Sequence, residues 1–341
     1  MEHAPKSVLV TGGTGFVGSY IVRELLLNHY KVRVLARPSS DLHLLEGIRA
    51  DIEVVEGDLL DIFSLEEAMK DMDLLINAAA VVSHQKTNRK RMLQVAIQGT
   101  GDLANTALRY GIKKMIHISS IAALGRMEEI NDIDEHQIFG HSKFDTAYGL
   151  SKFLAEQEIW RACAEGLPAV ILNPSFIIGA GKWSRSTPKY FDKIYKGLHH
   201  FPSGINGFVD VRDVAKAALK SLESPNSGER LIISAENQSY ETIFKAIGEG
   251  LQVKSSWKII SPALRLLLKW FRYLPLNQDK ELCSLQDDFL QIASMNSMYQ
   301  NAKSIELLHM DYTPVARSIE DTCKIYLKNK AQGKDFGILN V

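Results

Sequence analysis

The 341-residue sequence predicts an α/β fold: a doubly wound parallel sheet with a smaller, mostly helical C-terminal cap. Two observations predict it. Short β-branched runs alternate with longer amphipathic segments, and a glycine-rich turn follows the first of these runs. Near-continuous apolar runs separated by helices are typical of parallel strands that are buried on both faces. Right-handed crossovers wind such a sheet, and its ligands bind beyond the carboxyl ends of the strands.

Strands and helices are expected to alternate from the N-terminus to about residue 173. Six apolar runs are predicted strands: Ser7–Val10, Val32–Leu35, Ile52–Val55, Leu74–Asn77, Met115–Ile118 and Ala169–Leu172. The segments between them have apolar residues at helical spacing and are predicted helices: Phe16–Asn28, Asp41–Glu46, Ile62–Lys70, Met92–Tyr110 and Ala147–Ala164. Residues 1–173 are therefore predicted to form the domain that carries the sheet.

The alternation loosens in the stretch that follows, where one helix is expected at Pro188–Lys196. The pattern then resumes with a strand, a helix and a strand: Phe208–Val209, Val211–Leu222 and Arg230–Ile233. We expect residues 208–234 to return to the sheet domain. Residues 174–207 and 235–341 are expected to form the cap and a mostly helical tail.

Composition excludes several classes of protein. Forty basic residues balance forty acidic ones, so no strong electrostatic field attracts nucleic acid. The densest basic run, Lys86–Arg91, is interpreted as the solvated start of a helix, and a role in anion binding is left open. The three cysteines, Cys163, Cys283 and Cys323, suit neither a disulfide framework nor a zinc knuckle and fit a reducing compartment. The longest apolar stretch, Ile259–Leu276, is interrupted by prolines and charges, so no membrane span is expected. Since no signal peptide is visible, we expect a cytoplasmic location.

The turn after the first strand carries the fingerprint of a dinucleotide site. It reads Thr11-Gly-Gly-Thr-Gly-Phe-Val-Gly18, and Gly13, Gly15 and Gly18 satisfy the G-x-G-x-x-G spacing. Glycine allows positive φ, the close approach of backbone N–H groups to a pyrophosphate, and tight packing of the helix on the strand. The sequence therefore predicts that residues of this turn bind a dinucleotide: Gly12, Thr14, Gly15, Phe16, Val17 and Gly18.

The end of the second strand indicates which dinucleotide. Folds that take NAD usually place an acid here to hold the ribose 2′-hydroxyl. This chain has Ala36 in that place, followed by Arg37. A guanidinium can bind a 2′-phosphate through two hydrogen bonds, and nearby Ser39 and Ser40 add donors. NADP(H) is therefore favoured, with NAD(H) as the alternative and a solvated surface role for Arg37 left open.

Two further strand ends fit a nucleotide site. Asp58 follows the third strand, where its carboxylate can accept a hydrogen bond from the adenine amino group or cap a helix. Ala78, Ala79 and Ala80 follow the fourth strand, and their small side chains leave room for a cofactor across the strand ends. Tight packing of a helix on the sheet is the alternative reason for this run of alanines.

A Tyr-x-x-x-Lys pair places a phenol and an ammonium one turn apart on a helix, where the cation lowers the pKa of the tyrosine. The pattern occurs at Tyr110–Lys114, Tyr148–Lys152, Tyr299–Lys303 and Tyr326–Lys330. Gly111 is expected to end the helix after Tyr110, so that Lys114 enters the next strand, and the last two pairs lie in the cap or tail. Tyr148 opens a long helix after the fifth strand, so Tyr148 and Lys152 are the candidate acid–base couple.

The fifth strand ends in Ser119-Ser120. A serine at this point can hydrogen-bond the reacting oxygen beside the tyrosine. Capping of a helix is an equal alternative on spacing alone.

Together these motifs resemble those of the extended short-chain dehydrogenases/reductases, a family that includes sugar-nucleotide epimerases, dihydroflavonol reductases and 3β-hydroxysteroid dehydrogenases. The resemblance runs from about Val8 to Ser234 and rests on seven segments: Thr11–Gly18, Gly57–Leu59, Asn77–Ala80, Ser119–Ser120, Tyr148–Glu156, Asn173–Pro174 and Phe208–Val214. It implies a Rossmann-type sheet, with Tyr148 as acid/base, Lys152 on the nicotinamide ribose, and Ser120 orienting the substrate oxygen. Ser120 is preferred to Ser119 because the family's Ser-x-x-x-x-Gly spacing ends at Gly125. The resemblance adds three cofactor contacts: Leu59, Asn173 and Pro174.

Two departures from the family pattern bear on function. Ala96 stands where the family usually has asparagine, and no Thr-Asp-Glu follows the serines, which argues against dehydration. The resemblance, closest to the dihydroflavonol reductase and 3β-hydroxysteroid dehydrogenase branch, implies an NAD(P)-dependent oxidoreductase acting on a secondary alcohol or ketone. The alternatives are a sugar-nucleotide epimerase with tightly held NAD(P) and a non-catalytic NADP-binding regulatory protein. Family members often dimerise through the two long helices that correspond to Met92–Tyr110 and Ala147–Ala164. A homodimer and a monomer are therefore both left open as oligomeric states.

Overall fold

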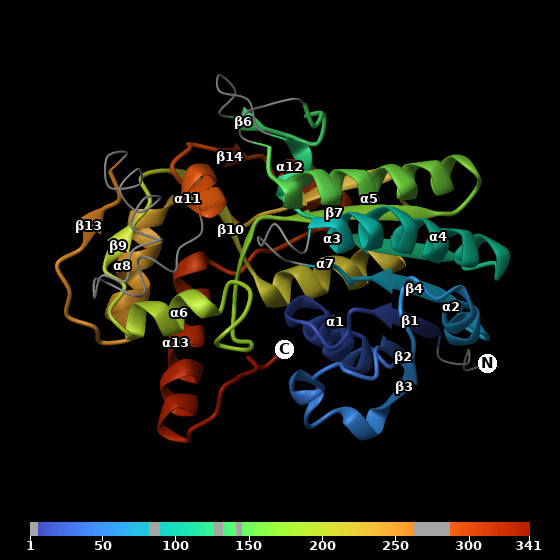
Figure 1. Ribbon diagram of the computed structural model, residues 1–341, viewed down its shortest axis with the longest axis horizontal. Helices are drawn as coiled ribbons and strands as arrows, with labels where there is room; N and C mark the ends of the chain where they lie inside the picture. The colour runs from blue at the N-terminus through green and yellow to red at the C-terminus, as the bar shows by residue number, and fades with distance from the viewer. Residues whose placement is uncertain (1–5, 82–88, 126–131, 141–144, 262–286) are drawn as a thin grey trace.

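Seven parallel strands form the central sheet of the computed structural model, which describes residues 6–81, 89–125, 132–140, 145–261 and 287–341 (Figure 1). The sheet order is β11-β7-β5-β4-β1-β2-β3. The strands are β1 (Ser7–Thr11), β2 (Lys31–Ala36), β3 (Ile52–Glu56), β4 (Leu74–Asn77), β5 (Lys114–Ile118), β7 (Ala169–Pro174) and β11 (Glu229–Ile233). The direction of winding reverses between β1 and β4, so the carboxyl ends of these two strands form the switch point at which such sheets bind ligands.

Helices cover both faces of this sheet, as the apolar strands predicted (Figure 1). On one face lie α1 (Phe16–Leu27) and α7 (Val211–Glu223), and on the other α2 (Ile62–Met69), α4 (Thr100–Arg109) and α5 (Ala147–Ala164). Successive strand residues alternate between the two cores, because side chains along a strand point to opposite faces. Val8 and Val10 thus pack in the α1–α7 core, whereas Leu9 packs in the α4–α5 core.

Two predicted helices differ from those observed. The helix expected at Met92–Tyr110 consists of α3 (Arg89–Gln94), a π-helical turn (Val95–Gly99) and α4. Leu59 packs against this turn, where a Cβ added to Gly99 would lie 3.1 Å from the Leu59 Cβ. The helix expected at Asp41–Glu46 is a single 3₁₀ turn at His43–Leu45. Elsewhere in the described ranges, 3₁₀ turns lie at Arg49–Asp51 and Ile121–Leu124.

A second sheet has the strand order β12-β10-β8, and its first strand in sequence, β8, follows β7 directly in the chain. Its strands are β8 (Phe176–Ile178), β10 (Ile205–Asp210) and β12 (Glu236–Ser239). The strand expected at Phe208–Val209 therefore exists, but it pairs with β8 and β12 rather than with the central sheet. From the predicted return segment, α7 and β11 do join the central layers.

The remaining elements of the described chain are short strand pairs and helices. The strand pairs are β9 (His200–Phe201) with β13 (Lys258–Ile259), and β6 (Asp132–Ile133) with β14 (Met298–Tyr299). The helices are α6 (Lys189–Tyr195), α8 (Tyr240–Gly250), α11 (Asp287–Ala293), α12 (Ala302–Leu308) and α13 (Val315–Ala331). In the described part of residues 235–341 each helix is longer than any of the strands, as expected for a mostly helical tail. None of the helices in the described ranges is long and apolar enough to cross a membrane, and most of the apolar stretch 259–276, like Cys283, lies outside those ranges.

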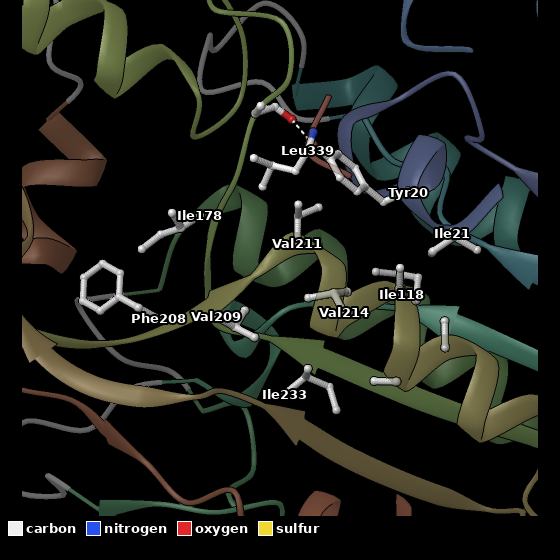
Figure 2. Close-up of a cluster of buried hydrophobic side chains, with 14 of the residues drawn as sticks. Tyr20, Ile21, Ile118, Ile178, Phe208, Val209, Val211, Val214, Ile233 and Leu339 are labelled. Carbon is white, nitrogen blue, oxygen red and sulfur yellow. Dashed lines mark hydrogen bonds between the residues drawn. The ribbon is translucent and has the colours of Figure 1, made fainter. Parts of the chain in front are cut away.

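One hydrophobic core joins the central sheet to the C-terminal segments (Figure 2). It includes Tyr20 of α1, Val211 of α7 and Phe208 of β10. The Tyr20 hydroxyl donates to the Ala180 carbonyl and accepts from the backbone N–H of Leu339, both at 2.8 Å. The C-terminal segment is thereby fixed against the helix that follows the glycine turn.

Candidate active site

The glycine turn connects β1 to α1 at the switch point. Gly12 has a φ of 70°, and a Cβ added there would lie 2.5 Å from the Ala78 carbonyl carbon. A Cβ on Gly18 would lie 2.1 Å from the Gly12 carbonyl oxygen, so a side chain at either position would force the strand ends or the helix apart. The close packing of the ends of β1 and β4 therefore depends on these two glycines.

The first turn of α1 offers backbone donors toward the strand ends. Gly15 is the N-cap residue and provides no side-chain hydrogen bond, while its own N–H donates to the Gly12 carbonyl at 2.9 Å. The N–H groups of Phe16 and Val17 are then left without a side-chain cap. Such groups at a helix N-terminus suit an anionic pyrophosphate. Thr14 lies half-buried at the apex of the turn.

Arg37 lies exposed directly after β2. Its backbone N–H donates to the Ser40 hydroxyl at 3.1 Å, and the Ser40 N–H donates to the Arg37 carbonyl at 2.8 Å, which closes a tight turn. Within the described ranges the Arg37 guanidinium forms no ion pair. The neighbouring carboxylate of Asp41 is paired with Lys182, whose hydrogen bond holds the pKa of Asp41 well below its usual range.

Asp58 does not cap the next helix, so that reading of the sequence is wrong. Its carboxylate accepts from the Leu60 N–H at 3.0 Å and from Arg91 at 3.1 Å, whereas Asp61 caps α2 through the Phe63 N–H. Of the predicted basic run, residues 89–91 lie inside the described ranges, and Arg91 contributes to this contact rather than being only solvated. The side chain of Leu59 is buried in the core on the α4–α5 face of the sheet.

The two serines after β5 have different partners. The Ser119 hydroxyl is buried and donates to the Glu156 carboxylate. Ser120 begins a 3₁₀ turn, accepts from the Ala122 N–H at 3.2 Å and forms a hydrogen bond with Tyr148. Ser120 is therefore the serine beside the tyrosine.

Asn173 links these groups. Its Nδ2 donates to the Ser120 carbonyl at 2.8 Å and to Glu156 at 2.7 Å. The Asn173 side chain is fully buried and supports the backbone of Ser120, while Pro174 is buried at the end of β7. Ala78 and Ala79 lie half-buried and Ala80 exposed after β4.

Tyr148 and Lys152 occupy the first turns of α5, whose N-terminus is capped by Thr146 through the Gly149 N–H at 3.0 Å. Lys152 is 6% exposed and its Nζ donates to the Ile118 carbonyl at 2.9 Å. Burial lowers the pKa of Lys152 to about 8, against the opposing charge of Glu156. Burial raises the pKa of Tyr148 above its ordinary value, and the hydrogen bond with Ser120 opposes this rise. The pKa of Tyr148 is therefore raised rather than lowered, contrary to the expectation from the Tyr-x-x-x-Lys spacing, and the group that opposes the rise is Ser120 rather than Lys152.

The other three Tyr-x-x-x-Lys pairs do not form such a site. Lys114 lies in β5, beyond the end of α4, as Gly111 predicted, and the 299–303 pair is divided between β14 and α12. The third pair shares α13, but the Tyr326 hydroxyl donates to the carboxylate of Asp192 on α6, at 2.9 Å. Only the pair on α5 adjoins the carboxyl end of β5.

Sequence reasoning missed the buried ion pair behind the site. Glu156, fully buried, lies 3.3 Å from the guanidinium of Arg230 on β11. Burial raises the pKa of Glu156, while Ser119 and Arg230 lower it. Glu156 follows Lys152 by four residues on the same helical face, and this spacing is the signal that could have drawn attention to it. No local sequence pattern around Glu156 or Arg230 indicates that these two residues, 74 positions apart, form an ion pair.

Comparison with known proteins gives the family. The model of the NAD-dependent epimerase/dehydratase family matches residues 8–234. The chain is 30% identical over 245 residues to sterol demethylase protein B of Methylococcus capsulatus, covering 71% of this chain and 74% of that protein. It is 29% identical over 240 residues to cinnamoyl-CoA reductase 1 of Oryza sativa, covering 66% and 70% of the two chains. The crystal structure of the UDP-glucose 4-epimerase of Thermotoga maritima shares the fold, with a TM-score of 0.77 at 20% identity over 95% of this chain and 99% of that one. From these matches and from its seven-stranded sheet, the chain belongs to the NAD-dependent epimerase/dehydratase family, within the extended short-chain dehydrogenases/reductases.

Proposed function

We propose that this protein is an NADP(H)-dependent oxidoreductase that transfers hydride between the nicotinamide ring and the carbon of a secondary alcohol or ketone. The observation that carries the proposal is the grouping of Ser120, Tyr148 and Lys152 at the carboxyl end of β5, in the sheet whose switch point holds the glycine turn. The bound cofactor supplies the hydride chemistry, and the chain supplies alignment and a proton.

Tyr148 is the proposed proton donor. Because burial raises its pKa, the phenol is neutral near pH 7 and has a proton to give to the oxygen of a ketone. The hydroxyl of Ser120, which is hydrogen-bonded to Tyr148, would orient the same oxygen. These roles favour the direction of reduction.

Lys152 is proposed to hold the nicotinamide ribose. Its ammonium has three hydrogens, and the Ile118 carbonyl accepts one of them. The others remain for the ribose hydroxyls and for neighbouring groups. With a pKa of about 8, Lys152 also exchanges protons readily near neutral pH.

The same proposal assigns the nucleotide end of the cofactor. The pyrophosphate would bind the N–H groups at Phe16 and Val17, and the guanidinium of Arg37 would bind the 2′-phosphate. We assign residues 1–173 and 208–234 to the cofactor domain, and residues 174–207 and 235–341 to the substrate cap. The name of the rice relative, a reductase, agrees with this reaction class.

Titration of the purified protein with NADPH and NADH tests the cofactor assignment. A charge-assisted guanidinium–phosphate contact is worth about 1.5–3 kcal/mol, so Arg37→Glu should weaken NADPH binding at least about tenfold and leave NADH binding unchanged. Arg49→Glu, the same charge reversal at another exposed position, is the matched control. A wild-type protein that binds NADH as tightly as NADPH would contradict the assignment.

A substrate panel of aromatic ketones and sugar nucleotides tests the reaction class. The proposal expects ketone-dependent oxidation of added NADPH. Conversion of a sugar nucleotide without added cofactor, on a dinucleotide that co-purifies with the protein, would instead identify an epimerase. Tight NADPH binding with no turnover across the panel would identify a non-catalytic binding protein.

A further inference from the structure

A row of polar side chains ends the strands on the α4–α5 face of the sheet. Along each strand the preceding residues on that face, such as Leu9, Leu75 and Met115, pack in the apolar core. Two residues further along, the same face carries Thr11 in β1, Asn77 in β4 and His117 in β5, all buried. His117 has no part in the proposed reaction, and a buried histidine beside an active site requires an account of its hydrogen bonds.

Hydrogen bonds fix the tautomer of His117, starting from the backbone. The Ala79 N–H can only donate, and it donates to Asn77 Oδ1 at 3.2 Å, as the Thr11 hydroxyl does at 2.7 Å. Asn77 Nδ2 is therefore the atom that faces His117 Nδ1, at 3.1 Å, and it donates to that nitrogen. Because Nδ1 accepts, the neutral ring carries its hydrogen on Nε2.

The ring stays neutral in this position. Burial, together with the positive charge of Lys152, lowers the pKa of His117 well below its ordinary value. Lys152 of α5 is the titratable group that lines the same cavity as the ring and whose charge acts on it. On the same helix Tyr148 lies one turn before Lys152, and Glu156 lies one turn after it and is paired with Arg230 of β11.

The Nε2–H group of His117 is buried and has no hydrogen-bond partner within the described ranges. His117 lines a cavity of about 20 Å³, which is enough for one water molecule. The cavity is also lined by Lys152 and Ser151 of α5 and by Ala96 of the π-helical turn. The Ser151 hydroxyl donates to the Tyr148 carbonyl at 2.7 Å, which leaves its oxygen free to accept.

We propose that one water molecule in this cavity accepts hydrogen bonds from His117 Nε2 and Lys152 Nζ, donates to the Ser151 hydroxyl, and makes His117 a positioning residue for Lys152. Three such bonds are typical of a buried water. The Lys152 ammonium then has two fixed acceptors, the Ile118 carbonyl at 2.9 Å and the water. Its third hydrogen is thereby directed to the remaining side, where the proposed function places the nicotinamide ribose. The inference about catalysis rests on that proposed function, whereas the water and the tautomer do not.

A high-resolution crystal structure of the wild-type protein tests the water directly. We expect one ordered water within hydrogen-bond distance of both His117 Nε2 and Lys152 Nζ. A dry cavity would overturn the proposal, and so would a ¹⁵N NMR spectrum that places the imidazole hydrogen of His117 on Nδ1. Neither measurement depends on finding a substrate.

Two variants of His117 test its effect on Lys152. His117→Phe keeps a ring but removes the donor, and His117→Gln places an amide N–H close to the position of Nε2. In His117→Phe the ammonium loses its water acceptor, so the titration midpoint of Lys152, followed by its ¹³Cε shift in the cofactor-free protein, should fall by at least about half a pH unit. His117→Gln should restore it. Met115→Leu, two residues earlier on the same buried face, is the packing control.

The kinetic consequence is measured on whichever ketone the wild type reduces. His117→Phe should lower kcat about tenfold or more with little change in KM, and its pH profile should shift in the direction of the Lys152 midpoint. His117→Gln should recover kcat to within about threefold of the wild type. A His117→Phe protein that folds, and whose Lys152 titration matches that of the wild type, would overturn the proposal. A wild type that turns over no ketone would refute the proposed function and leave the water and the titration to decide this inference.

Discussion

Replacing Lys152 by methionine should remove a pH-dependent destabilisation of the fold. In the folded chain the pKa of Lys152 is about 8, against 10.5 for an unperturbed lysine. The unfolded chain therefore binds the proton more tightly, and the buried ammonium opposes folding most at low pH. This cost is fully present below about pH 8 and disappears as the pH rises through 10.5. The wild type should thus gain stability relative to Lys152→Met on going to alkaline pH.

The magnitude follows from proton linkage. At 1.36 kcal/mol per pH unit, the difference between the two pKa values corresponds to about 3 kcal/mol at about pH 7 and about 1.4 kcal/mol at about pH 9.5. The stability difference between wild type and Lys152→Met should therefore change by about 2 kcal/mol across this interval. Terms that do not depend on pH, such as the lost bond to the Ile118 carbonyl, cancel in this comparison.

Urea denaturation of both cofactor-free proteins at several pH values measures this change. The control is Lys328→Met, at an exposed position of α13, whose curve should run parallel to that of the wild type. Parallel curves for wild type and Lys152→Met would refute the account, because they would mean that the ammonium is not desolvated in the folded chain. A gain in stability of the wild type relative to Lys152→Met at alkaline pH, as predicted, would show that the fold tolerates the cost of burying this lysine for the sake of its function.

Three further substitutions test the packing that supports the site, each by urea denaturation. Gly18→Ala should destabilise the fold by more than about 2 kcal/mol, because its Cβ would lie 2.1 Å from a backbone oxygen of the turn. The control Gly15→Ala, where the nearest atom is 3.2 Å away, should lower the stability much less. Equal losses of stability in the two variants would contradict the geometry. Arg230→Met should cost about 3–5 kcal/mol near neutral pH, because it leaves the buried Glu156 carboxylate without its ion pair, and the loss should shrink in acid as Glu156 takes up a proton; a loss that does not vary with pH would argue against that cause. Tyr20→Phe should cost about 2–3 kcal/mol, because it leaves a buried backbone N–H and a carbonyl unpaired, and a neutral substitution would show that the C-terminal segment is held in another way.

The parts of the site that the sequence could predict are those whose chemistry is local. A turn that must pass within van der Waals distance of a neighbouring strand requires glycine, so Gly12 and Gly18 were visible in the spacing alone. Tyr148 and Lys152 were visible because a single helix sets their separation. The central sheet was predicted from its apolar runs, since strands buried on both faces have a strong signal.

The parts that could not be predicted depend on contacts between distant segments. The strand β12 reads Glu-Asn-Gln-Ser and has no apolar signal, because it pairs with β10 at the edge of the small sheet and, among the described residues, with no other strand. The pairing of Glu156 with Arg230 and of Asp58 with Arg91 follows from the tertiary arrangement rather than from any local pattern. The direction of the Tyr148 pKa was also beyond reach, because it depends on how deeply the phenol is buried.

Single-turnover hydride transfer by Tyr148→Phe tests the central claim most directly. With saturating NADPH and a ketone that the wild type reduces, the account predicts that the variant binds NADPH with nearly unchanged affinity but loses hydride transfer by about a hundredfold or more. Tyr110→Phe, which removes the phenol of a pair divided between the C-cap of α4 and the start of β5, should behave as the wild type. Hydride transfer at the wild-type rate in Tyr148→Phe would contradict the account.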